Sequence, residues 1–337
     1  MLSRLSKTRK VLLIILIALM PIGLIKTDYY FMSPGPPYQW EIDYDTLDNY
    51  PFEGNLYQLT VRRDEANIFV YAWSLLNDSY DLYPREIILP GGVTPKELSE
   101  ISIQNMRTSE NVAIAVALKN IGDDIESKGD GVSVVGILDD SPVQNKLKKG
   151  DLLNSINAIE ISSASEFIST LRTYNIGETV SIGLLREVKG NLEQLYIETT
   201  LIEHVEYEGE PMVGFLATTV NERFDFPFEV DIKTGNVGGP SAGLMMALNV
   251  YNNLIPEDIT NAMIIAGTGT IEIDGSVGPV GGIKQKIIAA KRAGAELIIV
   301  PVANFEEAKV FETDKTAIVE VDSFAEALSV ISQYSSR

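Results

Sequence analysis

The sequence predicts a mixed α/β (α+β) protein in three parts: an N-terminal transmembrane anchor, a domain of short strands with two helices, and a C-terminal α/β domain. Three observations support this prediction. An apolar run follows the basic N-terminus, short strand patterns with two helical segments fill the middle, and strands alternate with helices in the last third. Such alternation favours a layered fold with partly parallel strands. A chain of 337 residues is long enough for about two or three units.

Charge and residue counts exclude several classes of function. The chain has 27 basic and 47 acidic residues, a formal net charge of -20. This argues against a nucleic-acid partner, because phosphate binding needs a positive field. There is no cysteine and one histidine, so disulfides, thiolate chemistry and a zinc site are not expected. We expect no metal ion and no cofactor.

Residues 1–32 are interpreted as a cytoplasmic tail and a transmembrane signal anchor. Basic residues precede the apolar run Val11 to Ile25, and Tyr29, Tyr30 and Phe31 follow it, where they would extend the span into the interfacial belt. An uncleaved anchor fits better than a removed signal peptide, because no A-x-A-like cleavage site follows the run. By the positive-inside rule, we expect a single-pass protein of the cell membrane with a cytoplasmic N-terminus and an extracytoplasmic catalytic part.

Residues 33–125 are expected to form an extracytoplasmic spacer or packing region. The proline-rich segment Ser33 to Gln39 cannot continue a helix. Thr94 begins a T-x-x-E capping box with proline at the first helical position, which marks the start of a long helix. The expected elements are a strand from Leu56 to Val61, an apolar helix from Glu65 to Leu76, and a helix from Pro95 to about Asn120.

Residues 126–205 form the second predicted unit. Its expected elements are strands at Val132 to Ile137, Leu152 to Ile156, Val180 to Leu185 and Leu195 to Leu201, with a short helix at Ser141-Pro142 and another from Ser163 to Thr173. This order, with "GVSVVGILDDSPVQNKLKKGDLLNSIN", resembles a PDZ domain over about 75 residues. The resemblance implies that a peptide adds as a strand beside Val132 to Ile137, in a groove closed by the Ser163 helix. Gly131, Val132 and Ser133 are the expected peptide-binding residues. A PDZ-shaped spacer that only positions the next domain is the alternative.

Residues 206–337 form the third predicted unit. The expected strands are Phe228 to Ile232, Ala262 to Ala266, Leu297 to Val300 and Ala317 to Val321, and the expected helices are Pro240 to Leu254, Ile283 to Ala293, Phe305 to Phe311 and Ser323 to Gln333. His204, in the connector before this unit, has no acidic or serine motif at catalytic spacing and is expected on the surface.

Ser241 is the candidate nucleophile. It lies in "GPSAG", which fits the G-x-S-x-G pattern, at the start of a predicted helix. The α/β-hydrolase order is excluded because no histidine follows Ser241. A chymotrypsin-like or subtilisin-like order would need His204, and the sequence context of those enzymes is missing. A lysine that is held neutral can serve as the base instead.

Lys286 is the lysine that helical periodicity points inward. At about 100° per residue it shares a face with Ile283, Ile287, Ala290 and Ala293, whereas Lys284, Gln285, Lys291 and Arg292 occupy the other side. Desolvation and a place in the first helical turn both lower the pKa of such an amine. A shift from about 10.4 to about 7.5 costs roughly 4 kcal/mol, which a buried site can supply. The alternative is that Lys286 extends to solvent from a boundary position.

The two motifs together resemble the proteolytic domain of Lon-type serine-lysine peptidases. "GGPSAGLMMAL" is followed, 45 residues after its serine, by the second lysine of "GTGTIEIDGSVGPVGGIKQKIIAAKRAGAELIIVP". With the anchor and the PDZ-like unit, the whole chain resembles bacterial membrane-anchored, PDZ-containing Lon-like proteases. The resemblance implies that Ser241 is the nucleophile, that Lys286 is the general base, and that the hydroxyl of Thr268 orients the lysine. It also implies peptide or protein substrates and a homo-oligomer, with a hexameric ring as the family's usual form.

The sequence departs from ATP-dependent Lon enzymes in two respects. Gly238 stands where those enzymes often have an acidic residue, and no G-x-x-x-x-G-K-[ST] phosphate loop is present. We therefore expect an ATP-independent serine endopeptidase, tethered to the membrane, that cleaves extracytoplasmic peptides or loosely folded proteins. The backbone N–H of Ser241 is the expected oxyanion donor, because Pro240 has none.

Two other functions remain as alternatives. A nucleotide-binding enzyme would use "GTGTIEIDG" or "GSVGPVGG" as a phosphate loop, but neither completes G-x-G-x-x-G at the start of a helix. A non-enzymatic membrane-tethered adaptor would bind peptides through the PDZ-like unit and keep the Lon-like unit as a scaffold. Retention of the serine, threonine and lysine together argues against the adaptor.

Overall fold

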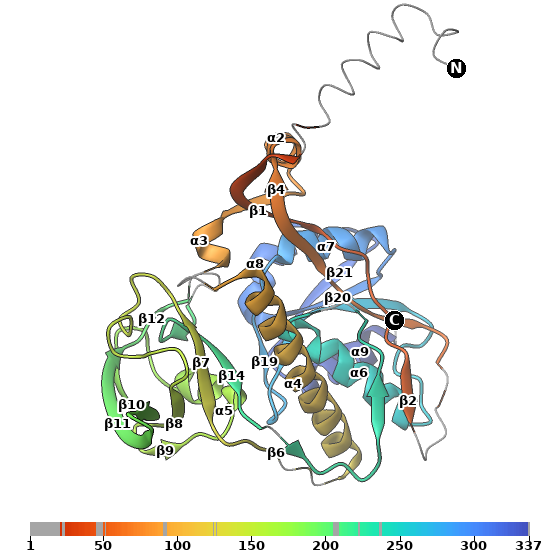
Figure 1. Ribbon diagram of the computed structural model, residues 1–337. Coiled ribbons are helices and arrows are strands. Elements are labelled where there is room, and N and C mark those ends of the chain that lie inside the picture. The colour runs from red at the N-terminus through yellow and green to blue at the C-terminus, as the bar shows by residue number, and fades with distance from the viewer. Residues whose placement is uncertain are drawn as a thin grey trace, which may run out of the picture.

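The computed structural model shows a layered α/β body with a smaller β-rich domain beside it (Figure 1). It describes residues 21, 24–44, 50, 52–89, 93–123, 125, 127–204, 209–221, 223–235 and 238–335.

A four-stranded sheet with parallel pairings is the centre of the body. Its order is β21-β20-β17-β3. The strands are β3 (Asn55–Gln58), β17 (Ile264–Gly267), β20 (Leu297–Pro301) and β21 (Ala317–Val321). The first strand comes from the region predicted to be a spacer, and the other three come from the last quarter of the chain. That region is therefore part of the body, because its strand hydrogen-bonds directly to β17.

Helices cover both faces of this sheet. They are α6 (Gly243–Leu254), α7 (Ile283–Arg292), α8 (Val302–Lys309) and α9 (Phe324–Ser335), with the 3₁₀ turn η4 (Pro240–Ala242) before α6. Ile265 and Ile299 pack with α6 and α9 on one face, whereas Ile298 and Val300 pack with α7 and α8 on the other. The alternation follows from the two-residue period of a strand. The predicted α/β layers are confirmed, and each predicted helix of this unit is present.

Helix α4 (Pro95–Ile121) crosses the body in front of α6 (Figure 1). Its predicted capping box is present: the side chain of Thr94 accepts from the N–H of Glu97, and the Glu97 carboxylate accepts from the N–H of Thr94. The stretch from Val112 to Leu118 is fully buried in the same core as α6. This helix is a wall of the α/β body.

A three-stranded sheet at the N-terminal side is formed by β1 (Lys26–Pro34), β4 (Val61–Asn67) and β5 (Asp81–Pro84), with α2 (Ile68–Ser74) and α3 (Arg85–Ile88) beside it. The predicted strand at Leu56 to Val61 is divided between β3 and β4. The predicted helix at Glu65 to Leu76 begins only after Asn67, whose side chain caps α2.

The predicted N-terminal anchor needs a correction. Residues 1–20, which hold most of the predicted span, lie outside the described residues. Tyr30 and Phe31, predicted for a membrane interface, are instead buried in β1. Among the residues that the structure describes, no helix is long and apolar enough to cross a membrane. This finding contradicts the predicted single-pass location in the cell membrane with an extracytoplasmic catalytic part.

The β-rich domain has a sheet in the order β11-β10-β8-β7-β14, with β9 paired to β8. Its elements are β7 (Val132–Ile137), β8 (Leu152–Ile156), β9 (Ile159–Glu160), α5 (Ala164–Leu171), β10 (Thr179–Val188), β11 (Asn191–Thr200) and β14 (Phe215–Thr219). The predicted helix at Ser141-Pro142 is a series of turns. Because β14 pairs with β7 and Val213 belongs to the domain core, this domain extends past residue 205, the predicted boundary.

Short two-stranded ladders complete the fold. They are β2 (Ile42–Tyr44) with β16 (Val230–Ile232), β6 (Ser127–Lys128) with β15 (Arg223–Phe224), β12 (Ile202–Glu203) with β13 (Pro211–Met212), and β18 (Thr270–Ile271) with β19 (Val277–Gly278). Two of these ladders, β2 with β16 and β6 with β15, pair a segment that precedes the β-rich domain with a segment that follows it. The β-rich domain is therefore inserted into the α/β body.

We predict that Gly243→Ala destabilises the body. A Cβ at Gly243 would lie 2.6 Å from a methyl of Ile271, 2.7 Å from the hydroxyl of Ser109 and 3.0 Å from the backbone nitrogen of Ile271. Relief requires backbone movement, so the free energy of unfolding in a urea titration should fall by about 1–3 kcal/mol.

Gly136→Ala is the milder control for that experiment. Its Cβ would first meet a side-chain methyl of Val93 at 2.9 Å, and a side chain gives way more readily than backbone. An unchanged unfolding free energy for Gly243→Ala would show that α4 and α6 are not in the close contact described.

Candidate active site

Ser241 lies in the one-turn 3₁₀ helix η4, at the start of α6. Gly239, which precedes the turn, has φ of 92°, a positive value that glycine adopts without strain because it has no Cβ. Pro240 is the first residue of the turn, where a missing N–H costs nothing. Ser241 is partly exposed. The N–H groups of a first helical turn have no acceptor within the helix. The turn can therefore present both a hydroxyl and a backbone donor to a ligand.

Three donors converge on the backbone carbonyl of Ser241. The hydroxyl of Thr268 donates to it at 3.0 Å, the N–H of Gly269 at 3.1 Å and Nε2 of Gln58 at 3.1 Å. Gln58 is 1% exposed, and its second N–H donates to the carbonyl of Leu59 at 2.9 Å. Because both acceptors are carbonyl oxygens, the amide must point its nitrogen toward them. The peptide unit after Ser241 is thus fixed from three sides.

Lys286 is buried, as predicted: the side chain is 2% exposed, in the fourth position of α7. Its Nζ donates to the hydroxyl oxygen of Thr268 at 2.8 Å, and Thr268 itself is fully buried. Desolvation by this burial lowers the pKa of Lys286 to about 7. A neutral amine that donates one N–H to Thr268 still has its lone pair available to accept a proton.

Thr268 connects the other two predicted residues, Ser241 and Lys286. Its hydroxyl accepts from Lys286 and donates to the carbonyl of Ser241, so serine and lysine are two hydrogen bonds apart through one side chain. Among the described residues, the hydroxyl of Ser241 makes no hydrogen bond to Nζ of Lys286. Catalytic hydrogen bonds of this kind often form only when substrate is bound.

The predicted exposed face of α7 is wrong at Gln285. It was placed on the outer side of α7 with Lys284, yet it is 0% exposed. Its Nε2 donates to Asp81 Oδ2 at 2.6 Å, and Nζ of Lys284 lies 2.5 Å from Asp81 Oδ1. Asp81 belongs to β5, so the N-terminal sheet covers the side of α7 that periodicity alone leaves open. This contact also holds the start of α7, where Lys286 lies.

Helix α4 holds the loop on the other side of Ser241. The N–H of Gly239 donates to the carbonyl of Ser102 at 3.0 Å, and the hydroxyl of Ser109 donates to the carbonyl of Pro240 at 3.1 Å. Sequence reasoning missed Ser102, Ser109 and Gln58. They carry no motif, and their partners lie more than 130 residues away in the chain.

The predicted peptide-binding residues Gly131, Val132 and Ser133 lie at the start of β7. Val132 and Ser133 pair with β8 on one side, and the whole of β7 pairs with β14 on the other. Among the described residues, Val132 and Ser133 are paired on both sides, so an added peptide strand does not fit beside them. The strand at the β7 end of this sheet is β14, and it lies beside α5, the helix that was expected to close the groove.

A cavity of about 480 Å³ lies where β14, α5, α4 and the serine loop meet. Its walls include Phe167 of α5, Phe215 of β14, Ser109 of α4, and Pro240 next to Ser241. His204 is in the same wall; it is half-buried rather than on the surface, and burial lowers its pKa. An apolar groove thus runs along the free edge of β14 up to the serine loop.

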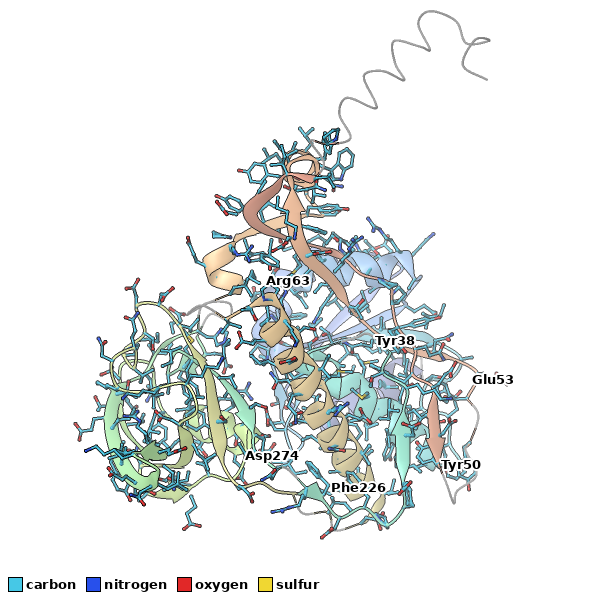
Figure 2. The ribbon with its side chains drawn as sticks, in the orientation of Figure 1. Tyr38, Tyr50, Glu53, Arg63, Phe226 and Asp274 are labelled. Carbon is cyan, nitrogen blue, oxygen red and sulfur yellow. The ribbon has the colours of Figure 1, made fainter. Side chains whose placement is uncertain are left out.

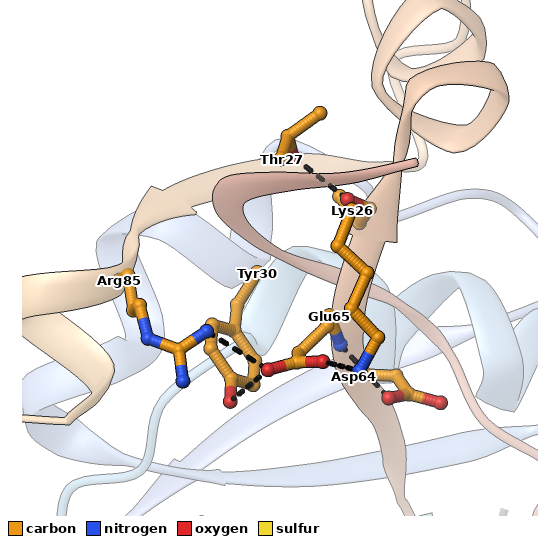
Figure 3. Close-up of polar contacts among 7 residues, drawn as sticks. Lys26, Thr27, Tyr30, Asp64, Glu65 and Arg85 are labelled. Atoms are coloured by element: carbon orange, nitrogen blue, oxygen red, sulfur yellow. Dashed lines mark hydrogen bonds and ion pairs between the residues drawn. The ribbon is translucent and has the colours of Figure 1, made fainter. Parts of the chain in front are cut away.

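A second cavity, of about 710 Å³, borders Gly238 three residues before Ser241. Its walls come from β1, β4 and the first half of α4, and Arg63, labelled in Figure 2, lines both cavities. Figure 3 shows the polar wall: Glu65 contacts Lys26 and Arg85, the latter at 2.9 Å. The hydrogen bond from Lys26, with another from Arg85, lowers the pKa of Glu65. The wall of this second cavity carries several charged side chains, whereas apolar side chains predominate in the wall of the first.

Comparison with known families gives two separate matches along the chain. Residues 226–331 match the Lon protease (S16) C-terminal proteolytic domain. Residues 99–199 match the PDZ domain family. The chain thus carries a Lon-type proteolytic domain and a PDZ domain, as the sequence motifs indicated.

Individual relatives agree over part of their length. Lon protease 2 of Bacillus subtilis (strain 168) is 35% identical over 125 residues, which is 36% of this chain and 22% of the relative. Lon protease 2 of Syntrophobacter fumaroxidans is 32% identical over 143 residues, or 42% of this chain and 17% of the relative. Among solved structures, the PDZ domain of an SdrC-like protein from Listeria monocytogenes is 31% identical, with a TM-score of 0.23, over 26% of this chain and 87% of that one. The chain therefore spans only about a fifth of the length of these Lon relatives.

We predict that Lys286→Met stabilises the protein at pH 7. Burial favours the neutral amine, and the substitution removes the desolvation cost while keeping the volume, so the free energy of unfolding should rise by about 2 kcal/mol. Between pH 7 and pH 10 the unfolded chain holds a proton on Lys286 that the folded chain lacks. Wild-type stability therefore rises with pH in this window, and the advantage of the variant shrinks.

Urea titrations at pH 7 and pH 10 measure this difference. Lys291→Met, on the same helix and outside the hydrogen-bonded network, is the matched control and should show no pH-dependent gain. A Lys286→Met protein less stable than wild type at both pH values would contradict a costly buried amine.

Proposed function

We propose that this chain, which joins a PDZ domain to a Lon protease (S16) C-terminal proteolytic domain, is a serine endopeptidase with a Ser241–Lys286 dyad. The observation that carries the proposal is the burial of Lys286, whose amine reaches Ser241 through the hydroxyl of Thr268. A buried lysine without an acidic partner costs stability, and base catalysis is a reason to keep one.

The proposed mechanism uses the chain's own groups at each step. Ser241 Oγ attacks the carbonyl carbon of a peptide bond while Nζ of Lys286 takes the hydroxyl proton. The N–H of Ser241 donates to the oxyanion of the tetrahedral intermediate. Lys286 returns the proton to the leaving amine, and the acyl-enzyme remains. A water then attacks the ester, and Lys286 accepts its proton and gives it back to Ser241.

We propose that the substrates are extended peptides or loosely folded proteins and that turnover needs no ATP. The sequence contains no G-x-x-x-x-G-K-[ST] loop, and the groups of the dyad are assembled within this chain. The polar cavity beside Gly238 leads to the serine loop and is the proposed approach for the scissile segment. We also propose that this chain forms a homo-oligomer.

We propose that the PDZ domain binds an extended peptide along β14. This strand is the last of its sheet, so its outward backbone groups are available for strand addition, and α5 forms the opposite wall. Apolar side chains such as Phe167 and Phe215 line the groove, which favours peptides with apolar residues at alternate positions.

We predict that Ser241→Ala and Lys286→Met each abolish cleavage of an unfolded protein such as casein, because the attack needs both the hydroxyl of Ser241 and a neutral amine that takes its proton. The loss of kcat/KM should be at least about 1,000-fold for each. Lys291→Met should retain full activity. Hydrolysis is followed by release of labelled peptides, with and without ATP, and ATP should make no difference.

Two outcomes of this assay would contradict the proposal. Wild-type turnover by a folded Ser241→Ala protein would reject the dyad. A wild-type protein that binds peptides without cleaving them would instead indicate an adaptor.

We predict that log(kcat/KM) rises with pH with unit slope and levels off above an apparent pKa of about 7. The base must be neutral, and the pKa of Lys286 is lowered to about 7 by burial, so activity is lost as the amine is protonated below that pH. The profile is measured from pH 5 to pH 9 with a fluorogenic peptide. A profile that still rises with unit slope at pH 9 would show an ordinary, solvated lysine.

A further inference from the structure

The serine loop is attached to α4 by two hydrogen bonds on one helix face. Ser102 accepts from Gly239 through its carbonyl, and Ser109 donates to Pro240 through its hydroxyl. Ser102 and Ser109 are seven residues apart, two helical turns, so they lie on the same face. Ser109 is 4% exposed. A buried serine in a helix usually bonds to a carbonyl of its own helix, but here the hydroxyl is directed at a different segment.

The bond from Ser109 acts on the peptide unit that carries the N–H of Ser241. In a trans peptide, the carbonyl of Pro240 and the N–H of Ser241 lie in one plane and point in opposite directions. A donor that holds the carbonyl oxygen therefore sets the direction of the N–H. Thr268, Gly269 and Gln58 hold the next peptide unit, after Ser241. Both peptide units that flank the nucleophile are thus fixed from outside.

We propose that Ser109 is a positioning residue that aims the N–H of Ser241 at the oxyanion. The proposal rests on the proposed function of Ser241 as nucleophile. Ser109 acts on the oxyanion donor through Pro240, whose carbonyl accepts its hydroxyl. The absence of a side chain at Gly243 makes room for it, since a Cβ there would lie 2.7 Å from its hydroxyl.

The expected effect of losing this bond is on the transition state. A misaimed donor stabilises the oxyanion less and leaves ground-state binding of the substrate unchanged. Ser109→Ala should lower kcat by about 10- to 100-fold with KM within about twofold of wild type. The affinity for a peptide aldehyde, which forms a tetrahedral adduct with Ser241, should fall by the same factor as kcat. The apparent pKa of the pH profile should be the same in Ser109→Ala as in wild type, because the substitution leaves the surroundings of Lys286 unchanged.

Asn111→Ala is the matched control. Asn111 follows Ser109 by two residues in α4 and is half-buried; it lines neither cavity and, among the described residues, makes no hydrogen bond to the serine loop. Its kcat and its affinity for the aldehyde should equal those of wild type. Ser109→Cys keeps the size with a weaker donor and should fall between serine and alanine in both quantities. This graded series tests the inference even if the alanine variant folds poorly.

The result that overturns the inference is a kcat and an aldehyde affinity within about twofold of wild type in both Ser109 variants. Equal loss of both quantities in Asn111→Ala would also overturn it, because the effect would then belong to general packing of α4. The failure of the proposed function looks different: wild-type protein would not be inhibited by the aldehyde, or Ser241→Ala would retain turnover.

Discussion

The contact between the amine of Lys286 and the hydroxyl of Thr268 is the constraint on which the rest of the structure depends. The amine is taken out of water, and among the described residues it has no carboxylate partner, so the surroundings must exclude solvent on every side. The first turn of α7 supplies one wall, Thr268 follows directly after β17, and the N-terminal sheet closes the outer side through the contact of Asp81 with Gln285 of α7. A looser arrangement would let the lysine recover its charge.

The insertion of the PDZ domain explains why such different parts of the chain meet at Ser241. Strand β3 and helix α4 precede the insertion, whereas η4, β17 and α7 follow it. Gln58 and Ser109, from the first part, hold the two peptide units that flank Ser241, from the second. The inserted domain lies against α4, and its groove shares a wall with the serine loop. An occupant of that groove therefore lies next to the bond between Ser109 and Pro240.

The elements that the sequence predicts well are those with local signals. Thr94 and Glu97 mark the start of α4 within four residues, and the spacing of Ile283, Lys286 and Ile287 identifies the buried face of α7. Periodicity fails at Gln285, because its burial comes from Asp81, some 200 residues away. The interaction of Ser109 with Pro240 has no local signature either, since both residues are ordinary in their own helices.

The larger misinterpretations have the same origin. Residues 33–125 lack a catalytic motif and were expected to form a spacer or packing region; no local pattern indicated that they contribute a strand of the central sheet and a wall of the core. The edge of β7 was expected to be free, but it is covered by β14, which lies beyond the expected domain boundary. Pairing between distant segments depends on the whole fold, and short strands such as β14 give little pattern of their own.

The most direct measurement of the central claim is an NMR titration of the lysine side chains in the full chain, observed through the carbon next to each amine. Comparison with Lys286→Met assigns the signal of Lys286. We predict that this amine titrates near pH 7, well below the reference value of about 10.4 for a lysine in a model peptide. A Lys286 signal that titrates together with the exposed lysines would contradict it.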